Sequence, residues 1–385
     1  MYSQAFNSPT WIYLTMGLLI TGGSLMRQRA WSTSLAFWVP LLVLLGRLCS
    51  FWLPTPVGVA IFSAVFWFVV RTGSQDKLLP TEGKAVFITG CDTGFGKTAA
   101  IQMDSLGFQV FATVLNMEGP GALELRKRCS PKLTLIQMDM RKHEDIESAL
   151  QITKKKLGRK GLWGLVNNAG ICTTIGDAEL SLMSSYRGCM EVNFFGTINV
   201  TKMFLPLVRQ EKGRIVTISS PSAEQPFPSL AAYGCSKAAL NLFMKTLRQE
   251  LKLWGVSVST ILPSAYKTAP SRDPFYWNDQ CEHLIRNLPP SLLEEYGEEY
   301  VQETKHLFQE FAKHTSEDFS PVINRIVEAL LSSKPNSRYY AGRGIRLMYF
   351  INDYLPSEVS DRYLQKIFLK KKILPRALNN SKPPS

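Results

Sequence analysis

Tyr233 and Lys237 stand four residues apart in a segment that reads as a helix, so their side chains should share one face. A phenol has an ordinary pKa near ~10 and is a poor base at neutral pH, unless a neighbouring cation favours its ionised form. Ser220 ends an apolar run at 214–219 that predicts a buried strand, which would deliver a hydroxyl at its C-terminal edge. Together the three residues predict a proton-transfer centre. A tyrosine and a lysine at this spacing also occur on ordinary solvated helices, so the elements around them must decide.

A glycine-rich turn follows the first apolar strand of the central region, at 85–88. It contains Gly90, Gly94 and Gly96 and leads directly into a helix-like segment. Such glycines let the backbone turn sharply and approach a pyrophosphate, while the helix offers free N–H groups and its positive end. The turn alone could equally be an ordinary loop between a strand and a helix.

Two further motifs follow in order. A strand ends in the tetrapeptide Asn167-Asn168-Ala169-Gly170, and a helix carries Asn193 within 190–196. With these, the region 82–270 resembles the short-chain dehydrogenase/reductase family, in the order and spacing of all five motifs. Strand and helix signals also alternate from Lys84 to about 263, which predicts βαβ units on a parallel sheet. We therefore expect an α/β fold, a Rossmann-type doubly wound parallel sheet, with helices near 97–106, 119–129, 143–157, 182–209 and 232–253.

Oxidation of a secondary alcohol needs a hydride acceptor and a base. Tyr233 would take the proton, Lys237 would favour the phenolate, and Ser220 would hold the substrate oxygen; Ser220 and Tyr233 are thus also the predicted substrate-binding residues. The resemblance adds Lys237 as a contact of the nicotinamide ribose and Asn193 as support for a water-linked proton path. It implies the following cofactor-binding residues: Gly90, Asp92, Thr93, Gly94, Phe95, Gly96, Asp139, Asn167, Ala169, Gly170, Tyr233, Lys237, Pro263 and Thr268.

We expect the cofactor to be NAD. The second strand ends in Val114, Leu115 and Asn116, with no arginine for a 2′-phosphate, and Asp92 would repel one. Lys97 counts slightly against this choice. The chain also departs from the family at Ser264, which replaces the glycine of a Pro-Gly motif and adds a side chain near the nicotinamide site.

Segments outside these motifs, such as 161–164 and 347–351, resemble the hydroxysteroid dehydrogenases of the family. This likeness implies oxidation of a steroid alcohol, first the 11β-hydroxyl of a glucocorticoid such as cortisol and next a 17β-hydroxyl. Retinol oxidation and a non-catalytic nucleotide-binding scaffold are further alternatives. The proline-rich segment 264–320, with Phe275, Tyr276 and Trp277, predicts an irregular insertion that covers a flat apolar ligand, or else an ordinary surface loop.

The N-terminal region predicts a membrane anchor over 1–78, followed by the catalytic domain at 79–345 and a basic amphipathic tail at 346–385. Long apolar runs suggest three spans near 10–26, 33–53 and 56–70. Arg27, Arg29, Arg71 and Lys77 flank the first and third spans, so the positive-inside rule places the catalytic domain in the cytosol. We expect a multi-pass protein of the endoplasmic reticulum membrane; two spans, or buried helices of a soluble protein, fit less well.

The net charge of +13 could suggest a nucleic-acid partner. Its clustered part lies at 362–376 among apolar residues, which favours contact with anionic membrane lipid or simple solvation, and no nucleic-acid binding. Seven cysteines without a C-x-x-C pair fit a reduced compartment, and four histidines show no metal-ligand spacing, so no metal is expected. A stripe of Ala239, Phe243, Leu247 and Leu251 should be buried, either in the core of the domain or, as the resemblance implies, in a homodimer interface.

Overall fold

The computed structural model describes residues 57, 60, 61, 64, 78–172, 176–268, 274–313, 315–368 and 373–379. The chain divides into two compact units, Met1–Lys77 and Leu78–Ser385. The three predicted spans lie almost wholly outside the described residues, and within those residues no helix combines the length and apolarity that crossing a bilayer requires. The membrane anchor therefore stays a prediction.

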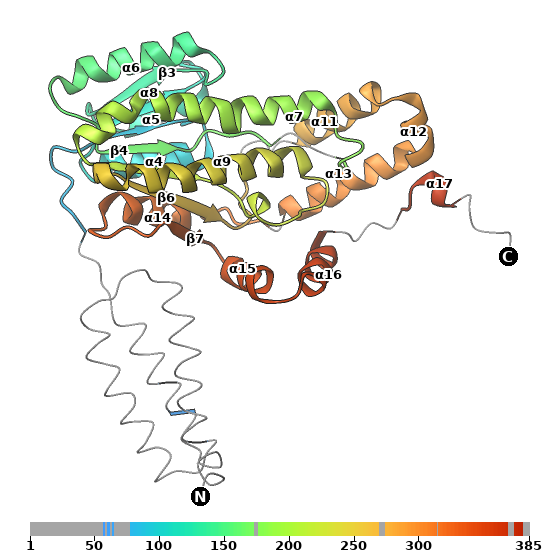
Figure 1. Ribbon diagram of the computed structural model, residues 1–385. Coiled ribbons are helices and arrows are strands. Elements are labelled where there is room, and N and C mark those ends of the chain that lie inside the picture. Colours follow the sequence, from blue (N-terminus) through green and yellow to red (C-terminus); the bar gives the residue numbers. More distant parts are fainter. Residues whose placement is uncertain are drawn as a thin grey trace, which may run out of the picture. The chain divides into compact units, whose positions relative to one another are not determined.

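Seven parallel strands form one sheet in the order β3-β2-β1-β4-β5-β6-β7 (Figure 1). Their bounds are β1 Ala85–Ile88, β2 Gln109–Val114, β3 Leu133–Gln137, β4 Gly164–Asn167, β5 Arg214–Ile218, β6 Ser257–Pro263 and β7 Arg338–Ala341. The strand order reverses between β1 and β4, and in open α/β sheets ligands bind at the carboxyl ends of the strands around such a point. The doubly wound parallel sheet expected from the sequence is confirmed.

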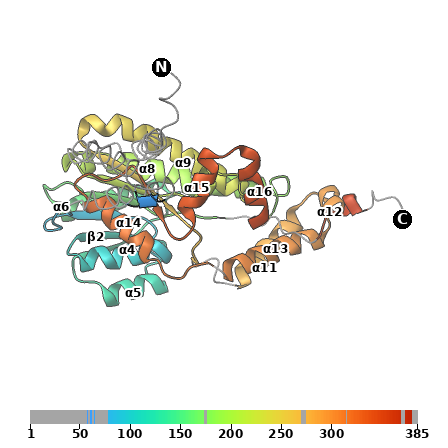
Figure 2. The same cartoon turned by 90° about the horizontal axis from the view of Figure 1, so that it is seen from below.

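Helices cover both faces of the sheet (Figures 1 and 2). On one face pack α4 Gly94–Ser105, α5 Pro120–Arg128 and α14 Ser320–Leu331; on the other pack α6 His143–Leu157, α8 Thr197–Gln210 and α9 Ala231–Glu250. Phe87 of β1, for example, is fully buried against Phe204 of α8, with ring centroids 4.1 Å apart. Two apolar layers thus hold the strand ends, and the loops that follow them, in fixed positions.

The helix predicted at 182–209 is not uniform. It consists of α7 Met183–Cys189, a π-helical turn η2 Met190–Gly196, and α8. Such π-turns are rare and frequently mark functional sites. The turn carries Asn193, one of the predicted catalytic residues, so the irregularity falls at the place where the sequence indicated chemistry.

The stripe predicted on the helix at 232–253 is correct in part. Leu247 and Leu251 are buried, whereas Ala239 and Phe243 are only half-buried. The buried face instead runs through Ala232, Ser236, Leu240, Met244, Leu247 and Leu251. Polar Ser236 interrupts this face, which is why apolar periodicity alone placed the stripe one residue off.

The segment expected to be irregular is largely helical. It forms α11 Pro274–Asn287, α12 Pro290–Tyr296 and α13 Glu298–Lys313. These three helices are grouped at one end of the catalytic unit (Figures 1 and 2). Pro274 and Pro290 each stand in the first turn of a helix, where the missing N–H costs nothing. The prolines therefore mark the breaks between helices, and they do not indicate that helices are absent.

After β7 the chain forms α15 Ile345–Tyr354, α16 Ser357–Phe368 and the short α17 Arg376–Asn379. Several apolar side chains of this region are exposed, among them Leu347, Phe350 and Tyr354. The region is helical, as expected for an amphipathic tail. Its contact with lipid stays a prediction.

Candidate active site

The structure brings Ser220, Tyr233 and Lys237 together from two neighbouring elements. Ser220 follows β5 and caps the short 3₁₀ helix η3 Pro221–Ala223, its Oγ accepting from the backbone N–H of Ser222. Tyr233 is the third residue of α9, and Lys237 lies one turn later. Burial raises the pKa of the Tyr233 phenol, and the neighbouring Ser220 hydroxyl lowers it in part. The three residues of the predicted proton-transfer centre therefore lie near one another; their chemical role stays a prediction.

Lys237 is a buried cation. Its side chain is 3% exposed, its Nζ donates to the carbonyl oxygen of Ile218 at 3.0 Å, and it lies 5.8 Å from the Tyr233 ring centroid. Burial lowers the pKa of Lys237 to about 8. The Tyr233 phenol behaves in the opposite way, since burial raises its pKa above the ordinary value. The phenol thus needs a nearby positive charge before it can act as a base.

Asn193 is fully buried behind this pair. Its Oδ1 accepts from the N–H of Ile171 at 2.8 Å, and its Nδ2 donates to the Ile171 carbonyl at 2.8 Å and to Ser236 Oγ at 2.9 Å. Gly170 lies at the junction, since a Cβ there would stand 3.1 Å from Asn193 Oδ1 and 3.3 Å from Lys237 Nζ. The π-turn, the end of β4 and α9 therefore meet at one point.

The glycine-rich turn has the shape of a phosphate-binding site. Gly90 and Gly94 have φ of +69° and +57°, which side chains rarely allow, and a Cβ on Gly96 would lie 2.2 Å from the Gly90 carbonyl oxygen. A Cβ on Gly94 would meet Thr268 first, with 3.7 Å to its Cγ2. Thr93 holds the N-cap position of α4 without a side-chain capping bond, and a helix N-terminus that follows a glycine-rich turn can bind phosphate through its free N–H groups. The turn therefore fits a dinucleotide pyrophosphate, with Thr268 on its other side.

The two asparagine side chains at the end of β4, Asn167 and Asn168, have different partners. Asn168 Nδ2 donates to the carbonyls of Thr89 and Gly90, both at 2.9 Å, and so holds the glycine-rich turn. Asn167 is buried and donates instead to Thr201 and Thr217. The predicted cofactor-binding residues include Asn167 and not Asn168, because the motif alone does not show which asparagine side chain faces the glycine-rich turn; cofactor binding by Asn167 stays a prediction.

The backbone of the same tetrapeptide is also tied to β1. Thr89 Oγ1 accepts from the N–H groups of Asn168 and Ala169, both at 3.0 Å. A Cβ on Gly90 would lie 2.8 Å from Ala169 Cα, so the two loops are in direct contact. Ala169 thus closes the wall of the predicted cofactor site by packing and not by a polar group.

Acidic side chains border the far end of the turn. Asp92 Oδ1 accepts from the N–H of Leu115 at 2.8 Å, which places this carboxylate beside the end of β2. Lys97 pairs with Glu124 on α5 and is therefore engaged within the protein. Asp139, after β3, pairs with Arg141 Nη2 at 2.6 Å, and this hydrogen bond holds its pKa below the ordinary range.

The departure at Ser264 is accommodated by a glycine elsewhere. Pro263 ends β6, and Ser264 donates its N–H to the Ala341 carbonyl of β7 at 2.7 Å. A Cβ on Gly342 would stand only 1.9 Å from Ser264 Oγ. The serine side chain thus occupies the space that the glycine leaves open. Phe95, another predicted cofactor residue, meets Tyr266 edge to ring at 5.3 Å close by.

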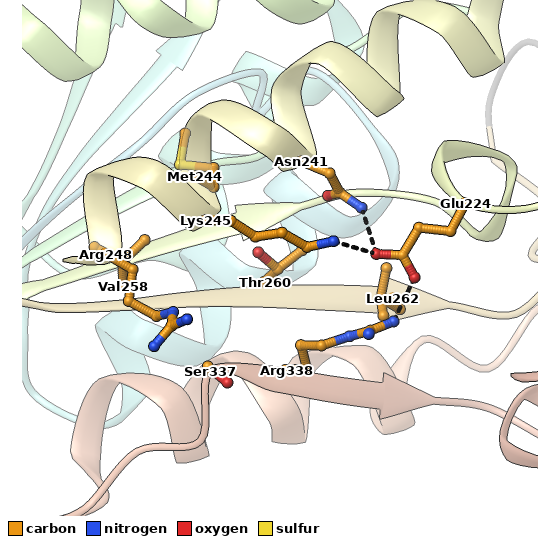
Figure 3. Close-up of a pocket in the computed structure, with 10 residues that line it drawn as sticks. All are labelled: Glu224, Asn241, Met244, Lys245, Arg248, Val258, Thr260, Leu262, Ser337 and Arg338. Carbon is orange, nitrogen blue, oxygen red and sulfur yellow. Dashed lines mark hydrogen bonds and ion pairs between the residues drawn. The ribbon is translucent and has the colours of Figure 1, made fainter. Parts of the chain in front are cut away.

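A polar pocket between α9, β6 and β7 supports the turn that carries Ser220 (Figure 3). Glu224 caps the C-terminal end of η3, and its carboxylate accepts from Asn241 at 3.2 Å and pairs with Lys245 at 3.2 Å and Arg338 at 2.5 Å. Ser220 therefore lies at one end of a short helix whose other end is fixed by three donors. No sequence signal could have found Glu224, because its partners come from distant elements.

A family model described as short chain dehydrogenase matches residues 84–278. The chain belongs to this family. Its members are oxidoreductases, and the matched region contains all five motifs. Within the described residues, no three His, Cys, Asp or Glu side chains gather to hold a metal ion; the expectation of no metal stays a prediction.

Known proteins place the chain more closely within the family. It is 48% identical over 310 residues to an 11-beta-hydroxysteroid dehydrogenase type 2 of Oryctolagus cuniculus, covering 80% of this chain and 76% of that protein. It is 38% identical to the 17-beta-hydroxysteroid dehydrogenase type 2 of Homo sapiens, covering 98% and 97%. A short chain dehydrogenase/reductase from Burkholderia phymatum, solved in complex with NAD, shares the fold with a TM-score of 0.58 and 18% identity, covering 77% of this chain and 99% of its own.

Proposed function

We propose that this protein is a hydroxysteroid dehydrogenase that oxidises the 11β-hydroxyl of a glucocorticoid, such as cortisol, to the ketone with NAD as the acceptor. The identity of 48% to an 11β enzyme over four fifths of the chain, against 38% to a 17β enzyme, carries this assignment. The 17β relative matches nearly the whole chain, which keeps oxidation of a 17β-hydroxyl as the second candidate.

The side chains of the site divide the work of such an oxidation. NAD, when bound, supplies the carbon that accepts the hydride. Ser220 holds the substrate oxygen, and Tyr233 takes the hydroxyl proton. Lys237 lowers the free energy of the phenolate by its charge, and its fixed bond to Ile218 keeps it in place. Asn193 and Ser236 form a hydrogen-bonded pair close to Lys237, where released protons could pass to solvent through water.

Two contacts support NAD over NADP. The Asp92 carboxylate lies beside the end of β2, where a 2′-phosphate would meet its negative charge. Lys97 of α4 is the cation that directly follows the glycine-rich turn. It is paired with Glu124, and this hydrogen bond lowers the pKa of the Glu124 carboxyl. A 2′-phosphate would therefore face an acid and a cation that already has a partner.

The assay uses microsomes carrying the full chain, with NAD and either cortisol or oestradiol as substrate, and a Tyr233→Phe variant as the control. Formation of cortisone that the variant loses would support the 11β assignment. Formation of oestrone would instead support oxidation of a 17β-hydroxyl. Turnover of neither would leave retinol oxidation, tested next, and NAD binding without any turnover would indicate a non-catalytic scaffold.

For location we propose a retained N-terminal anchor in the endoplasmic reticulum membrane, with the catalytic domain in the cytosol. The charge-free runs before residue 71 and the basic residues that flank them support this orientation. Protease added to sealed microsomes should digest the domain from 78 onward and spare the anchor. Protection of the domain would reverse the orientation.

For assembly we propose a homodimer through the outer face of α9, and contact of the basic C-terminal helices with lipid. Leu242 on α9 is 67% exposed, which leaves apolar surface available on that face. Cross-linking of detergent-solubilised full-length protein should give dimers that Leu242→Glu disrupts. An unchanged pattern in that variant would exclude this face.

A further inference from the structure

Asp177 joins two parts of the catalytic unit that are far apart in the sequence. It lies in the segment between β4 and α7, and its Oδ1 accepts from Ser229 Oγ at 2.9 Å. Its Oδ2 accepts from the Tyr300 hydroxyl at 2.5 Å. Ser229 immediately precedes Leu230, the cap of α9, whereas Tyr300 belongs to α13. One carboxylate thus connects the start of the catalytic helix to the group α11, α12 and α13.

The backbone at Ser229 depends on outside support. Its φ of +62° lies in the left-handed region, and Lys212 is the other non-glycine residue with positive φ in the described part of the chain. Such conformations persist where the surroundings hold them, and they cluster at functional sites. Ser229 is buried and stands four residues before Tyr233. The bond to Asp177 therefore fixes the turn from which the helix carrying the phenol begins.

The other side of the link is equally well packed. Tyr300 is 6% exposed and lies in an apolar cluster with Leu180 and with Leu284 of α11. Burial and the bond to Asp177 raise the pKa of its phenol, so it remains a donor throughout the physiological range. Tyr276 of α11 donates to the carbonyl of Cys172 at 2.8 Å, two residues beyond Gly170. The three helices therefore seat on the segment that borders the active site.

We propose that Asp177 is a positioning residue that couples the seating of α11–α13 to the placement of Tyr233. A large apolar substrate that packs under these helices would hold Tyr300 against Asp177, and Asp177 would in turn hold Ser229 and the start of α9. The phenol then reaches its working position when the helices are in place. This inference rests on the proposed function only in taking α11–α13 as the substrate cover.

The chain offers a matched control. Tyr296, the last residue of α12, donates its hydroxyl to Glu179 at 2.7 Å, so Tyr296→Phe removes a tyrosine–carboxylate bond from the same three helices and leaves both bonds of Asp177 in place. With the full chain in microsomes, Tyr300→Phe and Ser229→Ala should each lower kcat for cortisol about tenfold, the equivalent of one hydrogen bond to a charged group. The double variant should lose no more than the larger single effect, because both bonds act through Asp177. KM for NAD should match that of Tyr296→Phe.

Hydrogen exchange tests the coupling without turnover. Tyr300→Phe should speed amide exchange over residues 227–234, and Tyr296→Phe should not. This result holds whichever alcohol the enzyme oxidises, so failure of the proposed function and failure of the coupling are distinguishable. Unchanged exchange at 227–234 in Tyr300→Phe would overturn the proposal, as would fully additive losses of kcat in the double variant.

Discussion

Lys237 Nζ donates to the main-chain carbonyl of Ile218, two residues before Ser220. The cation beside the Tyr233 phenol is therefore fastened to the strand that leads to Ser220, the predicted substrate-binding residue. Movement of β5 relative to α9 would break this bond and separate all three groups together. The geometry explains why a side chain as flexible as lysine can hold a defined place in the site.

The fold carries a cost for this buried ammonium. The pKa of Lys237 falls from its ordinary value of 10.5 to about 8, so the folded state disfavours the protonated form. When folding lowers the pKa of a basic group, the loss of stability is complete at pH values below the pKa in the folded state. It disappears as the pH rises to the pKa in the unfolded state. Between about pH 7 and pH 11 the wild type should therefore gain about 3 kcal/mol of stability relative to Lys237→Met.

Chemical unfolding of both proteins across this pH range measures the difference. Lys237→Met should also abolish oxidation. Lys252→Met, at an exposed position shortly after α9, should change neither property. A stability difference that does not vary with pH would show that the ammonium is not the penalised group.

The pH dependence of the reaction follows from the same pair. Burial raises the pKa of Tyr233 and lowers that of Lys237, so the first proton leaves the pair near pH 8. Coupled groups share that proton, and the reactive arrangement is a constant fraction of the singly deprotonated pair. The logarithm of kcat/KM for oxidation should rise with unit slope below about pH 8 and then level off.

Lys237→Arg extends this test, because a guanidinium keeps its proton and should move the rising part of the profile to higher pH. In the bound state, the positive charge of the nicotinamide ring moves the curve to lower pH without changing its shape. Activity that declines steeply between pH 8 and 10 would contradict the assigned order of the two pKa values.

Much of the site could be predicted from the sequence because its residues belong to short local motifs. Tyr233 and Lys237 are fixed by helix spacing, and Gly90, Gly94 and Gly96 by the turn that they permit. Asn168, Glu224 and Asp177 could not be predicted in the same way. Their roles depend on partners such as Gly90, Arg338 and Tyr300, which only the folded chain brings near.

The fold shows the same division. Strand and helix alternation predicted the sheet and its two helical layers, because those patterns are local and periodic. The proline-rich segment was expected to be irregular, yet Pro290 opens α12. The π-turn at Asn193 also left no local trace, since the residues around it have ordinary helical character. Tertiary packing decides such details.

Cofactor preference provides a third prediction. Asp92→Asn keeps an oxygen that can accept from Leu115 N–H but removes the charge beside the expected 2′-phosphate position. The ratio of kcat/KM with NADP to that with NAD should rise roughly tenfold, since a nearby charge at an effective dielectric of about 20 is worth at least that factor. Asp104→Asn, which alters a comparable acceptor at the far end of α4, serves as the control. An unchanged ratio in Asp92→Asn would remove this carboxylate as a selectivity determinant.

Ser264 and Gly342 form a compensating pair, and their substitution gives the last prediction. Gly342→Ala places a Cβ 1.9 Å from Ser264 Oγ and should displace the ends of β6 and β7, weakening NAD binding and lowering the thermal midpoint. Ser264→Gly should restore part of both losses in the double variant, because it removes the clashing oxygen. The Tyr266 hydroxyl, 2.8 Å from the same Cβ, and the backbone at Gly342, with φ of +116°, account for the part that is not recovered. Gly344→Ala separates the two causes, since that glycine has φ of +73° but no neighbouring atom within 4 Å. It should lower the midpoint through strain alone, and Ser264→Gly should not rescue it. If Ser264→Gly helps Gly344→Ala as much as Gly342→Ala, the effect is general and the serine does not occupy the space that Gly342 provides.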